Sequence, residues 1–240
     1  MTDLDLHKIK ALTFDCYGTL IDWESGILTV LRAWACRHGA DSSGAQLLRA
    51  FADAEHRCQA QTPTAPYPEI LRAVHARIAA TLGLPTTSGE ADALARSIPD
   101  WPSFEDSPTA LAELKQRYKL LILSNIDRAS FAHSNRKLGV RFDAIITAED
   151  VGSYKPNPGH FLRAFEVLGA MGIGREQCLH VAQSLFHDHV PAQALGIRTV
   201  WVDRRHGRTG DGATPPPPDE VTPDLVVPDL AALAQLAAGP

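Results

Sequence analysis

The sequence predicts an α/β protein with a parallel sheet and an all-helical insertion after the first strand. Three patterns in the 240 residues support this prediction. An apolar run over residues 9–14 is typical of a buried strand. From residue 108 onward, helical periodicity alternates with short apolar strands, whereas the stretch between these two regions is helical throughout. Such alternation is typical of a doubly wound, Rossmann-like parallel sheet.

Four helices are expected in the insertion. In the first helix, apolar residues recur at helical spacing from Ile27 to Ala35, and Ser25 is the predicted cap. The next three helices are expected at about residues 46–61, 69–82 and 90–97. A proline-rich stretch then ends this helical block.

The second half of the chain predicts four helix–strand pairs, then an edge strand and a closing helix. The helices are expected at 109–118, 128–138, 158–168 and 192–195, and the strands at 120–123, 144–146, 178–182 and 199–202. Residues 207–223, with four consecutive prolines, predict a surface loop with no packing capacity. Residues 224–238 supply the edge strand and closing helix. We therefore expect a core of residues 1–21 and 104–240 and a helical domain of residues 22–103.

Composition excludes several classes of protein. The formal net charge is -5 and the pI is near 6.0, so there is no basic footprint for nucleic acid. No apolar run approaches the length of a membrane span, and the first ten residues lack the order of a signal peptide. Four scattered cysteines without a C-x-x-C pair fit reduced thiols. We expect a cytoplasmic protein with neither nucleic acid nor membrane as a partner.

Polar residues follow two of the predicted strands. Asp15 comes directly after the first strand and before a turn glycine, where open α/β sheets form ligand crevices. Taken alone, such an aspartate is more often a cap or turn residue. Ser124 and Asn125 end a later strand. They either cap the next helix or hold a substrate oxygen with help from that helix's N-terminus.

A lysine in a proline-rich loop adds a candidate cation. Lys155 precedes Pro156, and a residue before proline is held in an extended backbone. A lysine in a loop is usually exposed to solvent. Placed beside Asp15, however, its ammonium would keep the carboxylate ionised and offset charge that develops in a reaction.

The motifs together resemble those of the haloacid dehalogenase superfamily. Residues 14–20, FDCYGTL, are similar to its nucleophile motif. Ser124-Asn125 and Lys155-Pro156 are similar to its second and third motifs, and residues 181–188 align with its V-G-D-S-x-x-x-D segment. The resemblance implies a covalent intermediate on Asp15, pairing of Lys155 with that carboxylate, and a helical cap at the insertion.

Two positions separate the chemistries of this superfamily. Two residues after the nucleophile, its phosphatases carry an aspartate that protonates the leaving alcohol, and this chain has Tyr17 there. In the fourth motif they carry an aspartate that binds magnesium, and this chain has Gln183 there. Phosphoryl transfer needs Mg²⁺ and a proton for the alkoxide, whereas halide leaves carbon as a stable anion. The pattern resembles the type II, or 2-haloacid, dehalogenases. This implies hydrolysis of a short 2-haloacid through an ester on Asp15, with no metal and no cofactor.

The resemblance also implies roles for individual residues. The catalytic candidates are Asp15, Thr19, Lys155 and Asp188. The candidates for binding the substrate or the departing halide are Ser124, Asn125, Tyr17, Cys16, Ser184 and His187. Thr19 is expected to support the site, Lys155 to orient Asp15, and Asp188 to position Lys155 or the hydrolytic water. Cys16 also suits packing as a small hydrophobic residue.

The chain departs from type II dehalogenases at several positions. Leu185 stands where those enzymes usually carry an asparagine, and Phe161 lacks the hydroxyl of an aromatic residue that follows the motif lysine by six positions. The cap arginine that cradles the halide in those enzymes has no secure counterpart. The candidates in its place are Arg49, Arg57, His56 and Trp23.

Three alternatives remain beside this interpretation. His187 and His189 flank Asp188. Residues two apart do not share a helix face, so a metal site formed by these two histidines is disfavoured. The alternative role is that one of them polarises the hydrolytic water. A magnesium-dependent phosphatase of the superfamily would carry the two missing aspartates. A non-catalytic binding protein on the same scaffold would have no need of the nucleophile and its lysine. The expected partner is a small haloacid, and a homodimer is left open.

Overall fold

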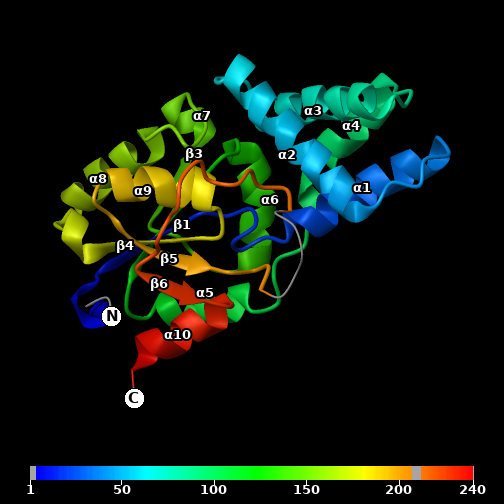
Figure 1. Ribbon diagram of the computed structural model, residues 1–240. Helices are drawn as coiled ribbons and strands as arrows, with labels where there is room; N and C mark the ends of the chain where they lie inside the picture. Colours follow the sequence, from blue (N-terminus) through cyan, green and yellow to red (C-terminus); the bar gives the residue numbers. More distant parts are fainter. Residues whose placement is uncertain (1–3, 207–211, 240) are drawn as a thin grey trace.

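The computed structural model describes residues 4–206 and 212–239. At its centre lies a six-stranded parallel sheet with the strand order β3-β2-β1-β4-β5-β6 (Figure 1). The strands are β1 (Ala11–Phe14), β2 (Lys119–Ser124), β3 (Ala144–Thr147), β4 (Cys178–Ala182), β5 (Arg198–Val202) and β6 (Leu225–Val227). The predicted α/β class, the parallel sheet and the edge strand are confirmed.

The strand order creates a crevice next to β1. The chain starts in the middle of the sheet, adds β2 and β3 on one side, and then returns to add β4, β5 and β6 on the other. Phe14 pairs with Ile122 of β2 and with Val181 of β4, so these three strands end at the same edge. Doubly wound sheets bind ligands where the strand order reverses, which here is the carboxyl end of β1.

Helices cover both faces of the sheet. Figure 1 shows α8 and α9 on one side, and α5 and α10 on the other. The helices around the sheet are α5 (Ser107–Leu114), α6 (Arg128–Leu138), α7 (Ala148–Val151), α8 (Gly159–Ala170), α9 (Val190–Ala194) and α10 (Leu230–Ala238). Strands β1 and β4 are buried along their whole length, which explains why they are continuous apolar runs.

Four further helices form a layer beside the sheet (Figure 1). They are α1 (Trp23–Arg37), α2 (Gly44–Gln61), α3 (Tyr67–Leu82) and α4 (Ser88–Arg96), and we call residues 23–96 the helical layer. Helix α3 packs between α2 and α4, and α1 packs against α2 and α4. Their apolar faces join the buried side chains of the sheet in one continuous cluster.

The starts of several helices differ by one to three residues from the sequence-based expectation, and two of them show a cause. Asp22, and not Ser25, caps α1, because the Asp22 side chain accepts the Ser25 backbone N–H at 3.2 Å. Helix α2 begins two residues earlier than expected, since Ser43 and Gln46 form a capping box. In both cases a local hydrogen bond decides the start, and the apolar pattern cannot reveal it.

Glycine permits a close contact between α1 and the segment that returns to the core. A Cβ atom on Gly26 would lie 2.1 Å from the Trp101 ring, so a larger residue could not occupy this position. Trp101 is fully buried, and its Nε1 donates to Ser97 Oγ at 2.9 Å. This contact fixes α1 against the end of the helical layer.

Part of the expected surface loop packs into the protein. Residues 207–211 lie outside the described residues, but Ala213 is fully buried and Thr214 is 8% exposed. The Ala213 backbone N–H donates to Glu24 Oε1 at 2.8 Å, which holds this segment against the start of α1. The prediction of a loop without packing capacity is therefore wrong for residues 213 and 214.

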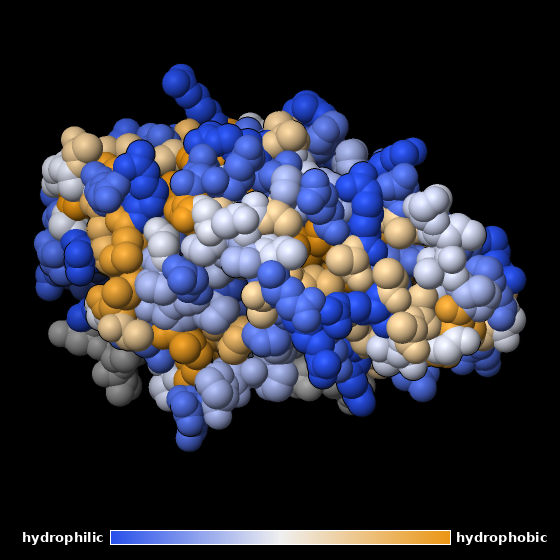
Figure 2. Space-filling model, turned by 90° about the horizontal axis from the view of Figure 1, so that it is seen from above, coloured by the Kyte–Doolittle hydropathy of each residue, from blue (hydrophilic) through white to orange (hydrophobic). Residues whose placement is uncertain are grey.

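The surface mixes hydrophobic and hydrophilic residues. Figure 2 shows one face on which hydrophobic residues form small groups among hydrophilic ones. The large apolar side chains most exposed in the structure are Leu162, Met171, Val226 and Leu236. Within residues 4–206 and 212–239, no helix combines the length and apolar character needed to cross a membrane.

Candidate active site

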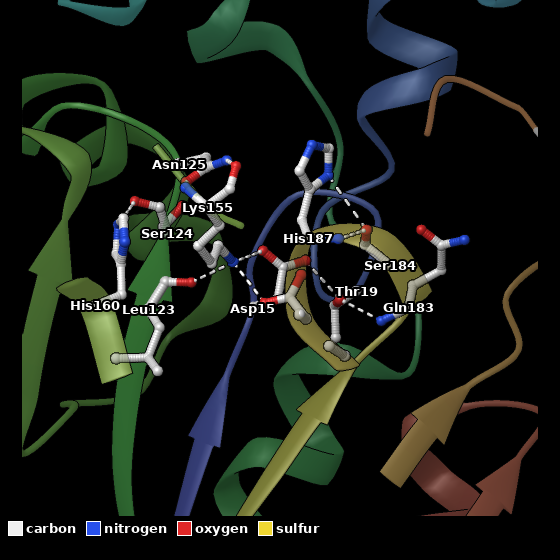
Figure 3. A network of polar contacts seen from close by, with 12 residues as sticks. Asp15, Thr19, Leu123, Ser124, Asn125, Lys155, His160, Gln183, Ser184 and His187 are labelled. Carbon is white, nitrogen blue, oxygen red and sulfur yellow. Dashed lines mark hydrogen bonds and ion pairs between the residues drawn. The ribbon is translucent and has the colours of Figure 1, made fainter. Parts of the chain in front are cut away.

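Asp15 lies at the carboxyl end of β1, in a tight turn. Gly18 adopts a φ of 95°, a conformation that favours glycine, and its N–H donates to the Ile21 carbonyl at 2.8 Å. This turn brings Thr19 back to Asp15, where the threonine Oγ1 donates to Asp15 Oδ2 at 2.7 Å (Figure 3). The carboxylate is only 6% exposed. The turn and the hydrogen bond from Thr19 therefore hold the carboxylate of the nucleophile candidate, Asp15, in one orientation.

Lys155 reaches the same carboxylate from the segment after α7. Its Nζ donates to Asp15 Oδ1 at 2.9 Å, to the Leu123 carbonyl at 2.8 Å and to Asp188 Oδ1 at 2.6 Å (Figure 3). The side chain is 1% exposed, so it is not a solvated loop lysine. Lys155 thus connects the ends of three neighbouring strands through its ammonium.

Asn125 holds the backbone of this lysine. Its Oδ1 accepts the Lys155 N–H at 2.7 Å, and its Nδ2 donates to the Lys155 carbonyl at 3.1 Å. The Ser124 hydroxyl is buried and has no hydrogen-bond partner in the described structure. Neither residue caps α6, because Asp127 accepts the Ser130 N–H there at 2.9 Å. The helix-cap alternative for Ser124 and Asn125 is therefore excluded.

A single ammonium serves two buried carboxylates, and their pKa values diverge. Burial raises the pKa of Asp15, although Lys155 acts in the opposite direction. Burial also acts on Asp188, but contact with Lys155 and a hydrogen bond to His180 hold the pKa of Asp188 below its usual value. Despite its own burial, Lys155 has a raised pKa because Asp15 and Asp188 favour the ammonium. Lys155 is therefore a permanent cation at this site.

His180 extends this network beneath the site and was not predicted from the sequence. Its Nε2 lies 3.0 Å from Asp188 Oδ1, and its Nδ1 lies 2.9 Å from Thr13 Oγ1. The imidazole is fully buried and packs edge-on against Phe161, with the ring centroids 4.8 Å apart. A histidine inside an apolar strand run is the only sequence signal that marks this position.

Ser184 and His187 lie on the other side of Asp15 (Figure 3). The Ser184 hydroxyl accepts the His187 backbone N–H at 2.9 Å and lies 3.2 Å from His187 Nδ1. Burial lowers the pKa of His187 to about 4, so its imidazole is neutral near pH 7. His189 lies 3.0 Å from the Ala182 carbonyl through its Nε2 and does not line the cavity. The two histidines therefore do not converge on one metal site.

These residues surround a cavity of about 410 Å³, including its mouth. Eight of the lining residues had been considered from the sequence: Asp15, Tyr17, Trp23, Asn125, Lys155, Ser184, His187 and Asp188. Cys16, Thr19 and Ser124 are fully buried and are not among the lining residues. Thr19 is joined to the lining by its hydrogen bond to Asp15, whereas Cys16 packs in the apolar core. The charged, polar and aromatic side chains that meet in this cleft suit a small polar molecule.

Four lining residues were missed: Glu55, Gln59, Tyr67 and Thr214. Tyr67 donates its hydroxyl to Glu55 Oε1 at 2.6 Å. Glu55 and Gln59 lie on the face of α2 that also buries Phe51 and Cys58. Two polar residues at the helical spacing of a buried apolar stripe were the available signal.

The arginine candidates for a halide cradle lie away from the cavity. Arg49, Arg57 and His56 are exposed, and none of them lines the cavity. His56 instead packs edge-on against Phe186, with centroids 5.6 Å apart. Of the four candidates, Trp23 alone lines the cavity. The helical layer therefore presents no described cationic side chain to the site.

The residues present fit Mg²⁺ poorly. Tyr17 donates to or accepts from Ser134 Oγ at 2.8 Å, and a Gln183 amide stands where a carboxylate ligand would be needed. Gln183 Oε1 already accepts a long bond from Thr214 Oγ1 at 3.4 Å. Among the described side chains, no group of three or more His, Cys, Asp or Glu converges as a metal-ligand set.

Known proteins with a similar sequence or fold include haloacid dehalogenases. A family model for haloacid dehalogenase-like hydrolases matches residues 9–185, and a HAD-hydrolase-like model matches residues 154–233. An (S)-2-haloacid dehalogenase of Pseudomonas sp. (strain YL) is 31% identical over 83% of this chain and 84% of its own length. Haloacetate dehalogenase H-2 of Moraxella sp. (strain B) is 28% identical over 97% of this chain and 100% of its own.

Two further matches bear on the alternatives. A phosphoserine phosphatase of Thermus thermophilus is 31% identical over 62% of this chain and 57% of its own length. The solved L-2-haloacid dehalogenase from Xanthobacter autotrophicus, with chloropropionic acid covalently bound, shares the fold with a TM-score of 0.76 at 24% identity, over 96% of this chain and 99% of the other. Since a family model spans most of the chain, the protein belongs to the haloacid dehalogenase-like hydrolases.

Proposed function

We propose that this protein hydrolyses short 2-haloacids to halide and 2-hydroxyacid through an ester on Asp15. One observation carries the proposal: the Asp15 carboxylate, paired with Lys155, faces a small cavity, and the motif positions 17 and 183 supply no carboxylate. The (S)-2-haloacid and haloacetate dehalogenases among the relatives support the same substrate class.

The first step is a displacement at carbon. An Asp15 oxygen forms a bond to C2 of the haloacid while the carbon–halogen bond breaks and the halogen takes the bonding electrons. Lys155 and Thr19 orient the carboxylate by holding one oxygen each. The amide of Asn125, which lines the cavity, is the proposed contact to the substrate, whereas Ser124 is fully buried and is not among the lining residues.

The second step is hydrolysis of the ester. A water adds to the Asp15 carboxyl carbon, and the bond from that carbon to the substrate oxygen then breaks. The product keeps an oxygen that came from Asp15, and the carboxylate keeps the oxygen of water. One proton of the attacking water passes to His187, which is neutral above about pH 4 and can return it to the departing alkoxide, and the other proton leaves the restored Asp15 carboxylate for solvent.

The same proposal includes the organisation of the chain. Residues 1–21 and 104–240 form the catalytic core, and residues 22–103 form a cap that closes the cavity with side chains of α1, α2 and α3. All four cysteines are free thiols, which supports the expected cytoplasmic location.

Halide release tests the proposal. Purified protein is offered chloro-, bromo- and fluoroacids beside a panel of small phosphate esters, with halide and phosphate measured in parallel. The proposal requires halide from at least one 2-haloacid and negligible phosphate.

The competing candidate is a magnesium-dependent phosphatase, which the phosphoserine phosphatase relative favours. It predicts phosphate release that needs Mg²⁺. Our proposal instead predicts the same rate of halide release in excess EDTA and in added Mg²⁺, because Gln183 and Tyr17 leave the metal and the alkoxide without their usual partners. Magnesium-dependent phosphate release, with no halide from any haloacid, would establish the competitor.

A further inference from the structure

Glu55 is a buried acid on the cap side of the cavity, and the mechanism above does not use it. It lies on α2, is 3% exposed and lines the cavity together with Asp15. The Tyr67 hydroxyl donates to its Oε1 at 2.6 Å. The hydrogen bond from Tyr67 is the one described for Glu55, and it leaves Oε2 without a described partner. One oxygen of this acid is therefore held and the other is left for a ligand.

Among the described residues, no cation forms an ion pair with Glu55. Six titratable residues line the cavity together with Glu55: Tyr67 from α3, Lys155 from the segment after α7, Tyr17 and Asp15 from the turn after β1, and His187 and Asp188 from the turn after β4. Two further titratable residues interact electrostatically with Glu55, namely Tyr154 from the segment after α7 and Cys58 on α2 itself. Lys155 is the one ammonium among them, and its three contacts are Asp15, Asp188 and a backbone carbonyl. Burial raises the pKa of Glu55 to about 7.

Displacement geometry places the departing halogen near Glu55. A nucleophile attacks carbon from the side opposite the leaving group, so the halogen points away from Asp15. Asp15 approaches from the sheet edge, whereas Glu55, Gln59 and Tyr67 line the cavity from the helical layer. An ionised carboxylate there would repel the halide that forms, while a neutral carboxylic acid would donate a hydrogen bond to it.

We propose that Glu55 acts as a neutral acid that donates a hydrogen bond from Oε2 to the departing halide, at a cavity that no described cap arginine lines. The role rests on the proposed dehalogenation. Fluoride, the poorest leaving group of the three halides and the best hydrogen-bond acceptor, depends on this donor more than chloride or bromide does.

The test is the pH profile of kcat/KM for halide release between pH 6 and pH 9. In the wild type, kcat/KM should fall by about tenfold per pH unit above pH 7, as Glu55 loses its proton. Glu55→Gln keeps a donor at the same position and keeps an oxygen for Tyr67, so its profile should stay flat and exceed the wild type at pH 9. Glu69→Gln, at an exposed position on α3, is the matched control and should retain the wild-type profile.

A second readout separates the proposed role from a structural one. Glu55→Ala, assayed at pH 6 below its measured unfolding temperature, should lose more activity on a fluoroacid than on the matching chloroacid and bromoacid. Equal losses on all three halides, or a wild-type profile that stays flat to pH 9, would overturn the role of Glu55 while leaving the dehalogenase proposal intact. If the wild type releases no halide from any haloacid, the proposed function is wrong and the role of Glu55 falls with it.

Discussion

The two sides of the cavity differ in how completely their polar groups are bonded. On the sheet side, Lys155 connects Asp15, Asp188 and a strand carbonyl, and Thr19 holds the other oxygen of Asp15. On the helical side, Glu55 has one bond from Tyr67 and no cation. A densely bonded network leaves its side chains little freedom, so the sheet side suits the displacement step that every substrate shares. The sparsely bonded helical side suits discrimination between leaving groups.

The largest effect is expected at the nucleophile. Asp15→Asn should abolish halide release while the protein stays folded, because the amide matches the carboxylate in size but is not a nucleophile. Halide assays and thermal unfolding of the variant measure the two parts of this prediction. Asp41→Asn, at an exposed position between α1 and α2, is the matched control and should keep full activity. Halide release by Asp15→Asn within tenfold of the wild type would exclude Asp15 as nucleophile.

The second-largest loss of activity is expected at Lys155. Lys155→Ala should lower kcat/KM by about 10²-fold or more, since the ammonium offsets charge around Asp15 during displacement. It should also reduce the free energy of unfolding by about 3–5 kcal/mol, because two buried carboxylates lose their cation. Lys10→Ala, at an exposed position before β1, should change neither quantity. Activity within a few-fold of the wild type would show that the ion pair serves only folding.

The helical side should also reveal itself in the stability of the protein. Folding raises the pKa of Glu55 from 4.5 to about 7 through burial, so between these pH values the folded protein holds a proton that the unfolded chain has released. The free energy of unfolding therefore falls as pH rises through this interval, and this contribution is level above pH 7. Glu55→Gln removes it.

Urea unfolding of the wild type and Glu55→Gln at pH 4.5 and pH 8 measures this effect. The variant should gain about 3 kcal/mol relative to the wild type between the two pH values. A difference that does not change with pH would mean that Glu55 is not buried as an acid. Glu69→Gln should show no such gain.

The residues on the sheet side of the cavity could be predicted from the sequence, whereas those on the helical side could not. Asp15, Asn125, Lys155 and Asp188 each follow a strand or a strand-linked turn, and parallel strands bring their carboxyl ends to one edge. Their proximity therefore followed from the order of the elements. The sheet, its edge strand and the four helices of the insertion were predictable from the spacing of apolar residues along the chain.

The helical side was not predictable in this way. Which face of α2 meets the cavity depends on how the helices pack, and Glu55 belongs to no motif. Arg49 and Arg57 were weighed as halide ligands because of their charge, yet both lie on the exposed face of α2. Thr214 was missed because its proline-rich surroundings predicted an exposed loop, whereas a hydrogen bond from Ala213 to Glu24 draws that segment inward.

Isotope labelling of the carboxylate tests the covalent pathway most directly. In a single turnover in ¹⁸O-labelled water, with enzyme in excess over a 2-haloacid, mass spectrometry of the peptide that contains Asp15 follows the oxygen of water. Attack by Asp15 on carbon predicts one ¹⁸O atom in its carboxylate and unlabelled oxygen at the new hydroxyl of the product. Label in that hydroxyl, with an unlabelled Asp15, would mean that water attacks the substrate directly and would contradict the proposed ester.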